Sequence, residues 1–95
     1  MIKVFEVSED EWVAAESAEQ AAAYYKQLVG QVAYDETTEE WGDPVELSDE
    51  ILNRLKWTDD EVMPARTITF AERLAEICAT TAPARFPQYF ATGNL

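Results

Sequence analysis

The chain has 95 residues, enough for one domain with its own hydrophobic core, and we expect no second domain. Nineteen acidic residues outweigh seven basic ones, so the net charge of −12 disfavours nucleic acid and anionic membranes as partners and favours a basic protein. No apolar stretch approaches the roughly 20 residues that span a bilayer, and the first residues lack the apolar run of a signal peptide. A single cysteine cannot form an internal disulfide, so we expect a cytoplasmic protein.

Two short runs of β-branched and aromatic residues, 2–7 and 11–15, predict a β-hairpin. A helix should follow from Ser17, whose side chain can accept a hydrogen bond from the Gln20 amide while the Gln20 side chain reaches back to the Ser17 amide. Gly30 should end this helix, since glycine adopts a left-handed conformation at little cost. The apolar residues that should face the core are Ala18, Ala21, Ala22, Tyr25, Leu28 and Val29.

The middle of the chain carries weaker signals. Residues 31–34 could form a third strand, and the charged run from Asp35 to Asp43 indicates a loop that closes in a Gly-Asp-Pro turn. Residues 45–47 predict a short strand. Ser48 then suits the N-cap of a short helix over about 49–57, with carboxylates in its first turn. A second acidic loop follows and consists of Asp59, Asp60 and Glu61.

A further short strand is predicted at 67–69, where Thr69 and Glu72 form a capping box that begins a helix over about 70–81. The apolar side of this helix consists of Phe70, Leu74, Ile77 and Cys78. We expect Cys78, at an apolar position, to be a small buried residue. The tail should dock back on the domain through Phe86, Tyr89 and Phe90.

These elements predict an α+β fold. An N-terminal β-hairpin with short additional strands should pack against two main helices, at about 17–29 and 70–81, and one short helix at about 49–57. We expect the hairpin and the two main helices to share one core.

The residues for common catalytic chemistry are missing. Without histidine the chain lacks the usual general base near neutral pH and the commonest transition-metal ligand. Its three glycines stand too far apart for a phosphate-binding loop. Carboxylate pairs such as Glu39 with Glu40 could serve a glycosidase or a Ca²⁺ or Mg²⁺ site, but the spacing of a calcium loop is absent. We therefore expect no enzyme, no cofactor and no metal.

The acidic charge is concentrated in the middle third of the chain. Residues 35–61 hold eleven acids and two bases, whereas residues 62–95 hold two acids and three bases. Carboxylates around Trp41 and Trp57 would suit a groove lined with arginine and lysine, with an aromatic ring as the buried anchor. The alternative is that the acids only keep the protein soluble and both tryptophans lie in the core. The predicted partner-binding residues are Asp35, Glu36, Glu39, Glu40, Trp41, Asp43, Asp59, Asp60 and Glu61.

Several stretches resemble small acidic orphan proteins of bacteriophages and prophages: VSEDEWVAAESAEQAAAYY, VELSDEIL, TFAERLAEI and FPQYFATGN. The resemblance covers most of the chain, and its motifs are structural. Proteins of this size and charge include anti-CRISPR proteins, which occupy basic nucleic-acid channels of Cas complexes or block subunit surfaces. The resemblance implies a non-enzymatic inhibitor in the host bacterial cytoplasm, with a CRISPR–Cas effector as partner. The alternatives are a structural or housekeeping phage protein whose acidity has no target and, third, an enzyme.

Overall fold

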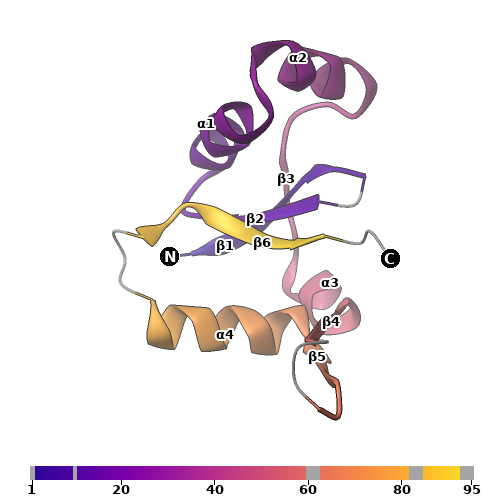
Figure 1. The fold of residues 1–95 in the computed structure, drawn as a ribbon, viewed down its shortest axis with the longest axis vertical. Helices are drawn as coiled ribbons and strands as arrows, with labels where there is room; N and C mark the ends of the chain where they lie inside the picture. Colours follow the sequence, from indigo (N-terminus) through magenta and orange to yellow (C-terminus); the bar gives the residue numbers. More distant parts are fainter. Residues whose placement is uncertain (1, 10, 60–62, 82–84, 93–95) are drawn as a thin grey trace.

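A computed structural model describes residues 2–9, 11–59, 63–81 and 85–92 of the chain (Figure 1). Its fold is α+β and begins with a β-hairpin, as the sequence predicts. The elements in chain order are β1 (Lys3–Ser8), β2 (Glu11–Ala15), α1 (Ala18–Val29), α2 (Gln31–Glu40), β3 (Val45–Glu46), α3 (Asp49–Arg54), β4 (Lys56–Asp59), β5 (Arg66–Thr69), α4 (Phe70–Thr80) and β6 (Gln88–Thr92).

Four strands form one antiparallel sheet in the order β3-β1-β2-β6, and β4 pairs with β5 in a separate hairpin. In the N-terminal hairpin, Val4 pairs with Ala14 and Phe5 pairs with Val13. Successive side chains of a strand point to opposite faces of the sheet, so these two neighbouring pairs belong to opposite faces. The tail docks on the domain as the edge strand β6.

The sheet lies between two helical layers, with α1 and α2 over one face and α4 and α3 over the other (Figure 1). Each face has its own core. The core on the α1 side consists of Phe5, Val7, Val13, Ala15, Ala21 and Tyr25. The core on the α4 side consists of Val4, Trp12, Ala14, Leu47, Leu52, Phe70, Ile77, Phe86 and Phe90. The expectation of one shared core is therefore wrong, because alternate residues of the same two strands supply the two clusters.

All three predicted helix starts, at Ser17, Ser48 and Thr69, are confirmed. Ser17 Oγ accepts a hydrogen bond from the Gln20 N–H at 3.1 Å, but Gln20 Oε1 accepts from the Glu16 N–H at 2.7 Å and not from the Ser17 amide. At α4 the capping box is complete, since Thr69 Oγ1 accepts from the Glu72 N–H and Glu72 Oε1 accepts from the Thr69 N–H. These local bonds satisfy amide groups that have no partner within a helix, which is why the sequence could predict them.

Two predictions for the middle of the chain are wrong, one in the type of element and one in the end of a helix. The segment expected to be a strand and a loop, residues 31–40, is the helix α2. The short helix α3 ends at Arg54 and not near residue 57, because residues 56–59 form β4 and pair with β5. Trp57 lies opposite Ile68 in that pairing, so a cross-strand contact replaces the last helical turn.

Burial also departs from the predicted apolar faces. Cys78 is exposed, which contradicts the expectation of a buried thiol. It lies about 80° around the helix from Phe70 and in the last turn of α4, at the margin of the buried face. Leu74 is half-buried against the α4-side core, and Leu28 of α1 is 53% exposed.

Candidate functional site

Helix α2 carries four of the nine predicted binding residues. Gly30 is the N-cap residue of this helix, and its φ of 92° lies in a region that favours glycine. The Gly30 N–H donates to the Lys26 carbonyl, and the Gly30 carbonyl accepts from the Tyr34 N–H. One glycine thus ends α1 and begins α2, so the chain changes direction without a loop.

A sequence signal for α2 was present and was missed. Residues 31–41 contain neither glycine nor proline, and Gln31 and Asp35 have the four-residue spacing of helical neighbours. In the structure Gln31 Nε2 donates to Asp35 Oδ1 at 2.8 Å. The charged run and the Gly-Asp-Pro turn that closes it favoured the loop interpretation. Both threonine hydroxyls of this run donate to backbone carbonyls within the helix.

Helix α2 contributes no buried residue to either core. Its inner face rests on α1 through Tyr34, whose ring centroid lies 6.5 Å from that of Tyr25 and 5.9 Å from Lys26 Nζ. The half-buried residues of this inner face are Ala33, Tyr34, Thr37 and Thr38. The exposed residues of the outer face are Val32, Asp35, Glu36, Glu39 and Glu40. The helix therefore presents its carboxylates to solvent, and we call these five residues the acidic face of α2.

The carboxylates of the acidic face form no ion pair with any described residue. Residues 27–53 contain no lysine or arginine, and none of the ion pairs between described residues involves a carboxylate of α2. Four carboxylates over residues 35–40 occupy about 9 Å of helix axis, or one charge per about 2.3 Å, close to the value of about 1.7 Å for duplex DNA. The acidic face thus has a linear charge density of the same order as a nucleic acid.

Trp41 lies directly after the acidic face, as the C-cap of α2. Its backbone N–H donates to the Thr37 carbonyl at 2.7 Å, while its side chain is left 42% exposed. Asp43 follows two residues later and is exposed. The structure thus brings Trp41, Asp43 and the four α2 carboxylates to one end of the molecule.

The remaining predicted residues lie elsewhere. Asp59 ends β4, and Figure 1 places α2 and the β4–β5 hairpin at opposite ends of the long axis, which measures 39 Å. Asp60 and Glu61 lie outside the described residues. Asp59 also lies opposite Arg66 in the hairpin, so a neighbouring cation offsets its charge. Asp59 therefore does not share a surface with the acidic face of α2.

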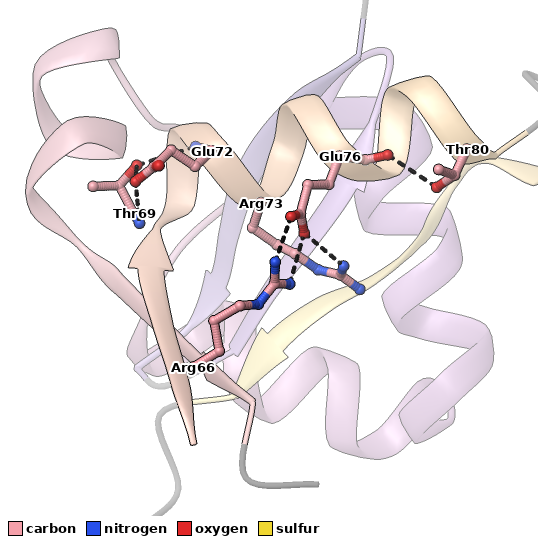
Figure 2. Close-up of polar contacts among 6 residues, drawn as sticks. All are labelled: Arg66, Thr69, Glu72, Arg73, Glu76 and Thr80. Carbon is pink, nitrogen blue, oxygen red and sulfur yellow. Dashed lines mark hydrogen bonds and ion pairs between the residues drawn. The ribbon is translucent and has the colours of Figure 1, made fainter. Parts of the chain in front are cut away.

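A network of charged side chains joins the β4–β5 hairpin to α4 (Figure 2). Both nitrogens at the tip of Arg66 donate to the Glu76 carboxylate, at 2.7 and 3.0 Å, and Arg73 Nη1 donates to Glu76 Oε1 at 3.3 Å. These bonds, chiefly those from Arg66, hold the pKa of Glu76 below its ordinary value. The hydrogen bond to the Thr69 N–H similarly lowers the pKa of Glu72. Both carboxylates therefore stay ionised near neutral pH and cannot act there as acids.

The same network covers Trp57. The Arg73 guanidinium lies 4.2 Å from the Trp57 ring centroid, and that of Arg66 lies 5.8 Å away. Trp57 is half-buried and packs against the α4-side core. Of the two tryptophans considered as anchors, Trp41 is exposed and Trp57 is engaged by cation–π contacts within the domain. Sequence reasoning missed this cluster because its members come from three separate elements.

No group of three or more acidic or cysteine side chains among the described residues could hold a metal ion. Within the same ranges, no helix has the length and apolarity needed to cross a membrane. Comparison of the chain with protein-family models, with curated proteins and with solved structures finds no match. The arguments for function therefore rest on the residues themselves.

Proposed function

We propose that this chain is a non-enzymatic inhibitor of phage or prophage origin that binds a host nucleic-acid-handling protein through the acidic face of α2. The proposed partner is a basic protein or nucleoprotein complex, with a CRISPR–Cas effector as the first candidate on the strength of the sequence resemblance. The observation that carries the proposal is the row of carboxylates, none of them in an ion pair with a described residue, on a helix that has no fully buried residue.

The physical argument concerns why such a helix is present. A surface helix in a small domain usually adds a broad apolar stripe to the core, whereas α2 has no fully buried residue and packs on the α1-side core only through the half-buried Tyr34. Its four carboxylates instead repel one another, which opposes folding slightly. A groove lined with arginine and lysine would relieve this repulsion, because its positive charges would attract the carboxylates as they normally attract the phosphates of a nucleic acid. The acidic face would then compete with nucleic acid for the groove.

Trp41 supplies the second part of the proposed interface. Charged rims mainly accelerate association, whereas aromatic side chains that fill a pocket mainly slow dissociation. The exposed ring stands at the end of the acidic face, so a partner held by the carboxylates would meet it. Asp59 would contribute only to a partner that also reaches the far end of the molecule.

The test is a displacement assay with purified Cas effector complexes, which measures whether the chain releases bound guide RNA or target DNA at low and at high salt. The key variant replaces Asp35, Glu36, Glu39 and Glu40 by their amides. The matched control neutralises Glu16, Glu19, Asp49 and Glu50, four exposed acids outside α2, and reaches the same net charge. We expect the α2 variant to associate with the effector complex at least about tenfold more slowly than the parent does. The control variant should associate at the rate of the parent.

Three further results complete the test. Trp41→Ala should raise the dissociation rate, and neutralising the segment 59–61 should have little effect. Equal weakening by both fourfold variants would mean that only net charge matters, which would contradict a specific acidic face. If no basic nucleic-acid-binding protein is displaced or captured at low salt, and a phage protein or a second copy of the chain binds in its place, the housekeeping alternative holds.

A further inference from the structure

Helix α2 differs from the other three described helices in how it begins. A serine or threonine hydroxyl caps α1, α3 and α4, and each of these helices has a carboxylate in its first turn. The N-cap of α2 is Gly30, which has no side chain, and the first turn of α2 holds no acidic residue. The start of α2 therefore lacks the side-chain cap and the favourable charge that stabilise the starts of the other helices.

The acidic residues of α2 stand toward its opposite end. Glu39 and Glu40 lie in the last turn, which has no basic residue, and Asp43 follows just beyond. The carbonyl end of a helix carries a partial negative charge, so carboxylates there destabilise the helix. Two pairs of carboxylates also stand four residues apart, a spacing at which like charges oppose helix formation. The pairs are Asp35 with Glu39 and Glu36 with Glu40. The charges of α2 thus oppose its own folding.

Packing attaches α2 to the domain through the half-buried face that contains Tyr34. Isolated helices shorter than about 12–15 residues are marginal in water, and α2 has 10 residues, none of them fully buried. Figure 1 shows α2 beside α1, at one end of the long axis. Gly30 and Gly42, both with positive φ, flank the helix and can absorb a change in backbone angles. Helix α2 can therefore leave α1 without disturbing the sheet.

The position of Trp41 depends on the last turn of α2. The Trp41 N–H donates to the Thr37 carbonyl at 2.7 Å. The next N–H, that of Gly42, donates to the Thr38 carbonyl at 3.0 Å. Both bonds break when this turn opens, and the Trp41 ring then loses its fixed place at the end of the acidic face. The order of α2 and the position of the proposed aromatic anchor are therefore coupled.

We propose that α2 opens and closes independently of the rest of the domain, and that positive charge brought to its carbonyl end closes it. Such charge would offset both the helix dipole and the repulsion among the carboxylates. The link to a partner rests on the proposed function: a basic partner would bind the acidic face, order α2 and fix Trp41 in one step. A surface without positive charge would meet an open α2 and no fixed anchor.

The measurement is amide hydrogen exchange of the full chain by NMR, with each rate divided by that of the same amide in an unfolded chain. Amides of α2 should exchange at least about a hundredfold faster than the central amides of α1, because α2 opens without global unfolding. Spermine, a polyamine with four positive charges, should slow exchange in α2 by at least about threefold and leave α1 unchanged. Sodium chloride at the same ionic strength should slow it less, since it only screens the charges.

Two matched variants test the role of the last turn. Glu39→Gln with Glu40→Gln should slow exchange in α2 by about threefold to thirtyfold. The control, Glu16→Gln with Glu19→Gln, changes the net charge equally at the amide end of α1 and should leave exchange in α2 unchanged.

Three results would overturn the proposal. Exchange in α2 within about threefold of that in α1 would contradict independent opening. Equal effects of the two double variants would contradict the role of the last turn, and exchange unaffected by spermine would contradict closing by positive charge. All of these measurements use the free chain, so failure to capture a basic partner would contradict the proposed function alone.

Discussion

Phe70 offers the sharpest test of the packing between α4 and the sheet. It is the first residue of α4, is 2% exposed, and contacts Trp12 and Phe90 edge-on at ring-centroid distances of 5.2 and 5.0 Å. Replacing a buried phenylalanine by alanine costs about 3–5 kcal/mol. A domain of this size has a total stability of about 5–14 kcal/mol. Phe70→Ala should therefore remove at least about a fifth of the free energy of unfolding, and nearly all of it if the total lies at the low end of this range.

Phe70→Leu separates the two components of this loss. Leucine keeps most of the apolar burial but removes both aromatic pairs, which are worth about 0.5–1.5 kcal/mol each, so we expect a loss of about 1–3 kcal/mol. The assay is urea unfolding followed by circular dichroism and by tryptophan fluorescence, which reports on Trp12 in the same core. Leu28→Ala, at an exposed position of α1, is the control and should change the free energy of unfolding by less than about 0.5 kcal/mol. A loss below about 1 kcal/mol for Phe70→Ala would refute the packing described.

Three other predictions concern single residues. Because the bonds from Arg66 hold the pKa of Glu76 below the ordinary 4.5, the stability they contribute is present above that value and is lost as pH falls through the lowered pKa. The difference in unfolding free energy between the parent and Glu76→Gln should thus shrink between about pH 6 and about pH 3, and a constant difference would contradict the pairing. Gly30→Ala should cost about 1–3 kcal/mol in a chemical melt, entirely through the backbone at φ 92° and ψ 161°, since no atom lies within 4 Å of an added Cβ. DTNB should label Cys78 at nearly the same rate in the folded and denatured protein, and slow labelling of the folded chain would place the thiol in the core.

The separation of the two acidic segments changes how the charge should be interpreted. In the sequence, residues 35–61 form one block of negative charge with a tryptophan in each half. In the fold, α2 and the β4–β5 hairpin lie on opposite sides of the sheet (Figure 1). The carboxylates of α2 form no ion pair with a described residue, whereas Arg66 lies opposite Asp59 in the hairpin. A flat partner surface would meet only one of them.

The sequence alone determined the features that depend on neighbouring residues. Ser17 and Thr69 were predicted as helix caps because the bonds that define a cap join residues three positions apart. The strands of the N-terminal hairpin followed from residue type, and the sequence shows directly that the chain lacks histidine, the commonest general base near neutral pH. None of these conclusions needed knowledge of distant contacts.

Tertiary structure decided the features that depend on residues far apart in the chain. Residues 56 and 57 leave the predicted helix because the strand that they begin pairs with β5. Strand β6 exists because β2, which precedes it by seven intervening elements, offers it an edge. Cys78 is exposed because the contact between α4 and the sheet decides which side of the helix is buried. The spacing of apolar residues along α4 defines that side only to within about 100° of rotation around the helix axis, which is the angle between successive residues. For the same reason, the sequence could supply the carboxylates of the candidate site, but only the fold could show which of them share a surface.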